Sequence, residues 1–195
     1  MAYLTREAWL RFPSAFSYLE AATLPCVGLT AWNALYGGRV LRPGHTVLTQ
    51  GTGGVSMFAV QFALAGGAQV IATTSSGAKG EFLKNVGVHH IINYKEDKGR
   101  EQSAKKLSIG QRGAQCIVEI GGPSILAQSS IAGAVDGTVA VIGTRGGQSQ
   151  SGSPSNHKNF FSTRRIMAGN RWQFEEMNRA IVANNIKPAL NERSF

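Results

Sequence analysis

The stretch that decides the fold is VLTQGTGGVSMFAVQFA, residues 47–63. It opens on an apolar run of the kind that forms a short buried strand. Gly51, Gly53 and Gly54 follow that run, and a mainly apolar segment with helical spacing, residues 55–65, follows the glycines. The stretch therefore predicts a strand, a tight turn built from glycines, and a helix.

The same alternation of short apolar runs and helical segments continues on both sides of this stretch. Strands are predicted at residues 46–50, 69–74, 90–93, 116–120, 138–142 and 165–168. Helices are predicted in residues 18–36, as two pieces broken at Pro25, and in residues 55–65, 80–85, part of 95–111, 124–134 and 172–184. Strands that alternate with helices form βαβ units. The predicted fold class is therefore α/β, a doubly wound parallel sheet of about six strands with helices on both faces.

Length and composition set the scale of this fold. The chain has 195 residues and a mass of 20.8 kDa, enough for one domain with one core. It is 43% hydrophobic with a mean hydropathy of −0.09, which is typical of a globular protein. We expect a single domain over residues 1–195, with leading helices in 1–40 and a tail at 186–195. No apolar run approaches the roughly 18 residues of a membrane span, so we expect a cytoplasmic protein with no membrane partner.

The charge of the chain is strongly positive. Lys and Arg number 20 against 11 Asp and Glu, which gives a formal net charge of +9 and a pI near 10.0. This balance suits phosphate-bearing partners, nucleic acid included. The small basic clusters have no RNP-like, zinc-finger or helix-turn-helix signature beside them, so we expect no specific nucleic-acid partner.

The glycine turn is the first candidate binding site. Backbone N–H groups and the positive end of the following helix can hold a pyrophosphate at such a turn. The third glycine of the common G-x-G-x-x-G pattern would fall at Ser56, so the match is G-x-G-G-x-S. An ordinary glycine-rich connection between a strand and a helix has the same pattern, and both interpretations stay open.

The end of the second predicted strand bears on which dinucleotide fits. Dinucleotide folds that prefer NAD(H) carry an acidic residue about 20 positions after the glycines, where it would repel a 2′-phosphate. Thr73, Thr74, Ser75 and Ser76 occupy that place here, and Lys79 follows. Hydroxyl donors and an ammonium group favour NADP(H) as the cofactor. The alternative for Lys79 is a solvated helix residue without a ligand.

These residues resemble the medium-chain dehydrogenase/reductase superfamily, in particular its quinone-oxidoreductase and zinc-type alcohol-dehydrogenase-like branches. The resemblance covers nearly the whole chain and is carried by four segments in the family's order and spacing. They are LPCVGLTAWNALY at 24–36, GHTVLTQGTGGVSMFAVQFA at 44–63, INYKED at 92–97 and IVEIGG at 117–122. It implies a Rossmann-type nucleotide-binding domain.

The resemblance also implies which residues surround the cofactor. The pyrophosphate would lie against Gly51, Gly53, Gly54 and Val55, and the 2′-phosphate against Ser75, Lys79 and Tyr94. Thr30 would pack near the nicotinamide, and Gly121 would border the adenosine. Ile142, Gly143 and Thr144 would line the nicotinamide side at the carboxyl end of the fifth strand, where the switch-point rule also expects ligands. Tyr94 could equally be an aromatic residue packed at the surface.

Cys26 stands where zinc-dependent relatives supply one ligand to a catalytic zinc ion. Such a site needs about three protein ligands. The family's other ligands come from a preceding GroES-like catalytic domain, which we expect this chain to lack, together with a further strand segment after residue 195. The four histidines have no spacing that resembles a ligand set. We therefore expect Cys26 to be a buried thiol and predict no metal.

Two functions follow from the resemblance. The first is an NADP(H)-dependent oxidoreductase that transfers hydride to or from a carbonyl or an activated alkene, such as a quinone, an enal or an alcohol. No catalytic residue can be assigned to it from the sequence. The alternative is a truncated, stand-alone family member with a non-redox biosynthetic role or a nucleotide-binding regulatory role.

The expected partners are a small-molecule substrate and a second copy of the chain. Family members often join the edge strands of two nucleotide domains into one sheet. In this chain the edge strand would be the predicted sixth strand, Arg165 to Ala168. Apolar surface left without a partner domain, around Trp9, Phe12 and Phe16, gives a further reason to expect a homodimer.

Overall fold

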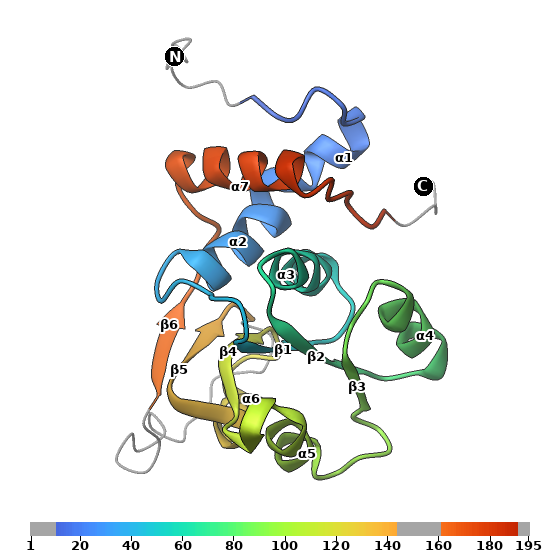
Figure 1. The fold of residues 1–195 in the computed structure, drawn as a ribbon, viewed down its shortest axis with the longest axis vertical. Helices are drawn as coiled ribbons and strands as arrows, with labels where there is room; N and C mark the ends of the chain where they lie inside the picture. The colour runs from blue at the N-terminus through green and yellow to red at the C-terminus, as the bar shows by residue number, and fades with distance from the viewer. Residues whose placement is uncertain (1–10, 144–160, 191–195) are drawn as a thin grey trace.

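The computed structural model describes residues 11–143 and 161–190 (Figure 1). Within them, six parallel strands form one sheet in the order β3-β2-β1-β4-β5-β6. The strands are β1 Thr46–Gln50, β2 Gln69–Thr74, β3 His90–Asn93, β4 Ala114–Glu119, β5 Gly133–Val141 and β6 Ser162–Arg165. This order, with a switch point between β1 and β4, is that of the doubly wound dinucleotide-binding fold. The predicted fold class is confirmed.

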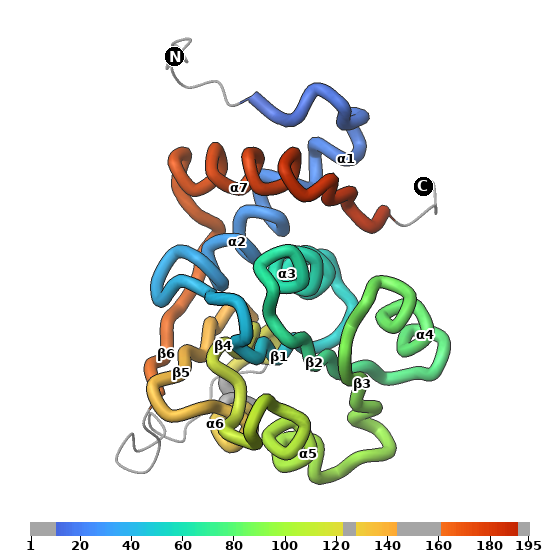
Figure 2. The backbone as a smooth tube through the Cα atoms, in the orientation of Figure 1, coloured from blue at the N-terminus to red at the C-terminus, as the bar shows by residue number. Residues whose placement is uncertain are grey.

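Helices cover both faces of the sheet (Figure 1). They are α1 Tyr18–Ala22, the π-helical turn η2 Leu24–Gly28, α2 Leu29–Tyr36, α3 Gly54–Ala65, α4 Gly77–Asn85, α5 Arg100–Leu107, the short 3-10 turn η3 Ile109–Gln111, α6 Pro123–Ala132 and α7 Arg171–Ala183. α2, α3, α4 and α7 pack on one face, and α5 and α6 on the other. Figures 1 and 2 both show α7 lying across α2. None of the helices described is long and apolar enough to cross a membrane.

Two apolar clusters, one on each face, form the core. The larger contains Leu35, Phe62 and Met177 from the helices α2, α3 and α7. The smaller contains Ile71 and Ile117 from the strands, packed against α5 and α6. Because both faces of a parallel sheet are buried, its strands read as nearly continuous apolar runs. The sequence located β1, β2 and β3 at their observed bounds.

The sixth strand lies three residues earlier than predicted. β6 is Ser162–Arg165, and residues 166–168 already turn toward α7. Ala168 has a left-handed φ of +47°, and its carbonyl accepts a hydrogen bond from Asn33 Nδ2 at 2.6 Å. This contact with α2 decides where the strand ends, and neither its donor nor its geometry can be read from the local sequence.

Other predicted boundaries also differ: β4 begins at Ala114 instead of residue 116, and α6 ends at Ala132 instead of residue 134. β5 begins at Gly133, five residues before the predicted start, because its pairing with β4 continues across the positive-φ residue Asp136. β4 ends at Glu119 instead of residue 120, since Glu119 Oε1 accepts the N–H of Gly121 and turns the chain. The two helical pieces predicted in residues 18–36 are present, as α1 and as η2 continuing into α2, but the break between them is at Thr23. Pro25 lies just after the break, in the first turn of the π-helical segment, where its missing N–H costs no helical bond.

Candidate functional site

The glycine turn between β1 and α3 is built to present backbone N–H groups. Gly51 has a φ of +70°, a conformation that favours glycine, and its N–H donates to Thr73 O at 2.9 Å. Gly53 is the N-cap of α3 and no side chain caps the helix. A Cβ on Gly53 would meet nothing within 4 Å. The positive end of α3 therefore faces open space, as an anion-binding turn requires.

The other two residues of the motif hold the turn in place. A Cβ on Gly54 would lie 3.2 Å from the side chain of Val27, so α3 begins in tight contact with η2. Ser56, at the place of the third glycine, donates from Oγ to Gln50 O at 2.6 Å. This bond ties the first turn of α3 to the end of β1 and explains a serine there. Val55 follows Gly54 in the first turn of α3, and Thr30 is buried in α2.

The residues predicted for a 2′-phosphate lie after β2 and β3, which are neighbours in the sheet. Ser75 follows β2. Lys79 is exposed in the first turn of α4, and its N–H is bonded to the capping hydroxyl of Ser76 at 3.5 Å. Tyr94 N donates to Thr74 O at 3.0 Å, which places Tyr94 beside the end of β2. The fold thus brings these three residues to the same end of the neighbouring strands β2 and β3.

The turns after β4 and β5 touch one another. The N–H groups of Ile142 and Gly143 donate to Glu119 O at 2.9 and 3.2 Å. A Cβ on Gly143 would lie 1.8 Å from Ile120 O, so only glycine fits there. Gly121 lies in the same contact. The predicted Gly121, Ile142 and Gly143 therefore lie together, and Thr144 lies outside the described residues.

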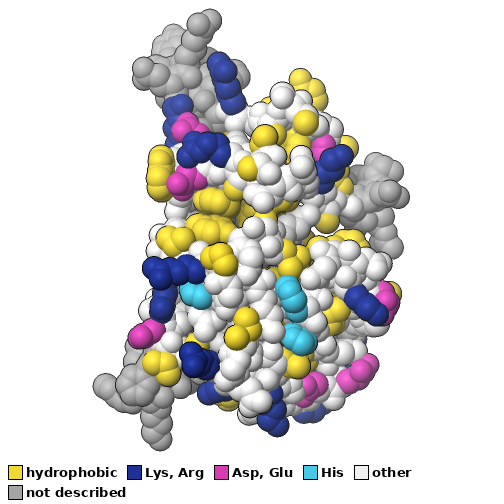
Figure 3. Space-filling model, viewed as in Figure 1, with side chains coloured by type: hydrophobic (Ala, Val, Ile, Leu, Met, Phe, Trp, Pro, Cys, Tyr) yellow, Lys and Arg dark blue, Asp and Glu magenta, His cyan; other side chains and the backbone are white. Residues whose placement is uncertain are grey.

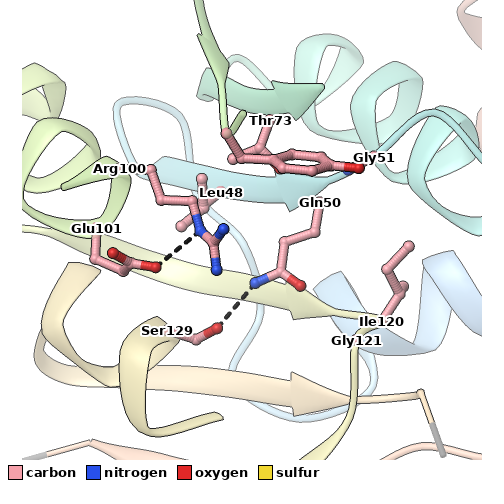
Figure 4. Close-up of a pocket in the computed structure, with 10 residues that line it drawn as sticks. Leu48, Gln50, Gly51, Thr73, Arg100, Glu101, Ile120, Gly121 and Ser129 are labelled. Carbon is pink, nitrogen blue, oxygen red and sulfur yellow. Dashed lines mark hydrogen bonds and ion pairs between the residues drawn. The ribbon is translucent and has the colours of Figure 1, made fainter. Parts of the chain in front are cut away.

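A cavity of about 290 Å³ opens at the carboxyl ends of β1, β2 and β4, against α5 and α6 (Figure 4). Its lining is Leu48, Gln50, Gly51, Thr73, Tyr94, Arg100, Glu101, Ile120, Gly121 and Ser129. Three predicted residues, Gly51, Tyr94 and Gly121, belong to this lining. The other predicted residues that are described lie outside it, around the glycine turn, the β2 edge and the β5 turn.

A buried carboxylate organises the floor of this cavity. Glu119 is 0% exposed. Its Oε1 accepts the N–H groups of Gly121 and Gly122 at 2.7 and 3.2 Å, and its Oε2 accepts Gln50 Nε2 at 2.9 Å and the hydroxyl of Ser129. Both oxygens are thus occupied within the protein, which a fully buried carboxylate requires. Glu119 therefore joins the β1 and β4 ends to α6 without being free for a ligand.

Arg100 forms one wall of the cavity. Its Nε pairs with Glu101 Oε1 at 2.8 Å and its Nη2 donates to Gln128 Oε1 at 2.7 Å. The guanidinium carbon lies 5.8 Å from the ring centroid of Tyr94. Two planar groups thus stand at the same side of the cavity and suit contact with a flat ring.

Sequence reasoning missed Gln50, Glu119, Ser129 and Arg100. Gln50 could have been found from the sequence, because it directly precedes the glycine turn. Glu119 carries a signal too, as the acid in the otherwise apolar run CIVEI. Ser129 and Arg100 carry none, since they reach the cavity only through the packing of α5 and α6.

Cys26 is exposed in the π-helical turn, so the expectation of a buried thiol is wrong. The π-helical winding places its side chain outside the apolar contacts that bury Leu24. In residues 11–143 and 161–190, no cluster of His, Cys, Asp or Glu side chains is arranged to hold a metal ion. His157 lies outside those ranges.

The strand order, the glycine turn at the switch point and the adjoining cavity define a nucleotide-binding domain. The chain matches the family model described as "Zinc-binding dehydrogenase" over residues 54–183. It therefore belongs to the zinc-binding dehydrogenase family, within the medium-chain dehydrogenase/reductase superfamily.

Individual relatives agree with this assignment. A zinc-type alcohol dehydrogenase-like protein of Schizosaccharomyces pombe is 38% identical over 98% of this chain and 57% of its own length. The solved structure of a candidate alcohol dehydrogenase from Sinorhizobium meliloti 1021 has a TM-score of 0.86 at 39% identity, over 94% of this chain and 54% of that one. A mycobacterial protein solved with NADPH has a TM-score of 0.77 at 26% identity, over 89% and 57%. The chain thus spans about half the length of the relatives it matches.

Proposed function

We propose that this chain is the cofactor-binding domain of an NADP(H)-dependent oxidoreductase. The proposed reaction transfers hydride to or from a carbonyl or an activated alkene. One observation carries the proposal: the uncapped N-terminus of α3, opened by Gly53, lies at the switch point next to a cavity. The family and its alcohol-dehydrogenase-like members support an oxidoreductase, and the mycobacterial relative solved with NADPH supports the choice of cofactor.

The residues present fit such a cofactor. Gly53 leaves room for a pyrophosphate against the first N–H groups of α3, and Gly54 allows that end of the helix to pack closely against Val27 of η2. Ser75, Lys79 and Tyr94 offer hydroxyl and ammonium groups for a 2′-phosphate, and no acidic side chain ends β2 to repel it. The cavity beyond Gly51 has the flat, partly apolar walls that suit an adenine ring.

When bound, the nicotinamide would donate or accept the hydride, and the chain's own residues would orient it. The glycine turn fixes the pyrophosphate and so sets the position of both ends of the dinucleotide. Thr30, Ile142 and Gly143 would border the nicotinamide end.

The proposal is tested by titrating the purified chain with NADPH and NADH in a calorimeter. We expect NADPH to bind more tightly. Lys79→Ala should weaken NADPH about tenfold and leave NADH unchanged, because an exposed ammonium that pairs with a phosphate contributes on this scale. Lys84→Ala, which removes an exposed lysine at the other end of α4, is the matched control and should change neither.

The outcomes separate the candidate functions. Equal affinities for NADH and NADPH would overturn the NADP(H) choice. A folded protein that binds neither would overturn the oxidoreductase proposal and favour the non-redox alternative. If NADPH binds, loss of its absorbance with a panel of quinones, enals and aldehydes tests hydride transfer directly.

We also propose that two copies pair through β6. This strand is at the edge of the sheet, and its backbone has no neighbouring strand on the outer side among the described residues. Met167 and Trp172, just after it, are 95% and 63% exposed. An edge strand flanked by exposed apolar side chains is a natural surface for pairing.

A further inference from the structure

Gln50 carries a buried polar atom that has no partner. Its Nε2 donates to Glu119 Oε2 at 2.9 Å and to Ser129 Oγ at 2.8 Å. Its Oε1 is buried, and nothing in the described parts of the chain donates a hydrogen bond to it. Buried acceptors are nearly always satisfied, so an unsatisfied one in a cavity wall indicates a missing donor.

The amide of Gln50 is fixed in one orientation. The single hydroxyl hydrogen of Ser129 goes to Glu119 Oε2, so Ser129 Oγ can only accept from Gln50. Glu119 Oε2 accepts as well. Turning the amide over would set its oxygen against these two acceptors, and a buried clash of this kind is expensive. The acceptor is therefore held in place and does not adapt to the ligand.

The Gln50 side chain lies at the floor of the cavity. Gln50 is part of the lining, and Figure 4 shows its nitrogen directed at Ser129 and its oxygen directed the other way, toward Ile120 and Gly121. The walls beside it combine apolar side chains, Leu48 and Ile120, with the planar guanidinium of Arg100. A flat ring would fit between these walls, and a hydrogen-bond donor at the edge of the ring would match the acceptor Gln50 Oε1.

We propose that Gln50 Oε1 determines base specificity by accepting a hydrogen bond from the exocyclic amine of adenine. The inference rests on the proposed function, because it requires a dinucleotide with its base in this cavity. A purine that carries a carbonyl oxygen in place of the amine would set an acceptor against Gln50 Oε1. Sites built to satisfy a buried polar group reject analogues that leave it unpaired.

The experiment compares NADPH with its hypoxanthine analogue, which replaces the amine with a carbonyl oxygen, by calorimetry on the full chain. We expect the analogue to bind at least about tenfold more weakly. Gln50→Met, which keeps the length of the side chain and removes the amide, should bring the two affinities within about twofold. Gln61→Met is the matched control and should keep the discrimination. Gln61 also has a buried oxygen without a partner, but it lies outside the cavity, with Nε2 bonded to Lys187 O.

Each outcome decides one of the two proposals. Equal binding of NADPH and its analogue to the wild-type chain overturns the role of Gln50, whether or not the variant folds. Discrimination that survives in a folded Gln50→Met protein overturns it too, because another residue must then recognise the base. Failure of both ligands to bind contradicts the proposed function itself.

Discussion

The two thiols of this chain differ sharply in environment at the scale of single residues. Burial raises the pKa of Cys116 to about 12, and its Sγ donates to Ala34 O at 3.7 Å. Cys26 is exposed. Because only the thiolate is nucleophilic, and a raised pKa keeps the thiol protonated until the pH approaches 12, Cys116 should be inert at pH 8. An aromatic disulfide reagent should therefore modify one thiol in the folded protein and two in guanidinium chloride.

The variant Cys26→Ser is the control for this count. It should show no modification while folded and one after unfolding. Modification of both thiols at similar rates in the folded wild type would mean that the β4 core opens readily, and would contradict the burial of Cys116.

At the scale of elements, one buried side chain links the first and last parts of the fold. Asn33 of α2 donates to Ala168 O, and its Oδ1 accepts from Arg164 in β6 and from Gln173 in α7. Asn33→Ala removes these three bonds in a largely buried place: Ala168 O and Gln173 Nε2 lose this partner, and Arg164 keeps its bond from Nη1 to the backbone oxygen of residue 33. We expect it to lower the free energy of unfolding by about 2–3 kcal/mol, measured by urea denaturation.

The matched control for this prediction is Asn184→Ala at the exposed end of α7. Its exposed side chain bonds to Ala180 O in the last turn of the helix and to nothing else in the described parts of the chain, so its loss should cost less than about 0.5 kcal/mol. A similar small change for Asn33→Ala would show that α7 is not held by this network. In that case the apolar contacts of Met177 and Ile181 alone would secure the helix.

The elements also show what sequence could predict. The bounds of β1, β2 and β3 agree with the prediction because each strand has a short apolar centre, at residues 47–48, 70–72 or 91–92, between turn and helix signals. β6 was displaced because its end depends on a contact with Asn33, far away in sequence. The site divides in the same way. Local patterns indicated the glycine turn, whereas Gln50, Glu119 and Ser129 meet only when β1, β4 and α6 are assembled.

At the scale of the whole molecule, the effect of the net charge of +9 depends on how the charged side chains are distributed over the surface. On the face shown in Figure 3, Lys and Arg are spread over the margins, and Asp and Glu lie among them. Hydrophobic side chains occupy much of the upper part of the same face, around α1, α2 and α7. This distribution gives a general attraction for anionic ligands, and on this face it does not form one basic patch for nucleic acid.

The proposed pairing through β6 is a property of the whole molecule and can be tested without disturbing the fold. Met167→Lys places a charge at a position that is 95% exposed, so it removes no buried contact within one chain, but it opposes pairing of two edges. Val182→Lys, at a 61% exposed position near the other end of α7, is the matched control. Light scattering at micromolar concentration should show a dimer for the wild type and Val182→Lys, and a monomer for Met167→Lys. A wild-type monomer would overturn the pairing, and a dimer that persists in Met167→Lys would move the interface to another surface.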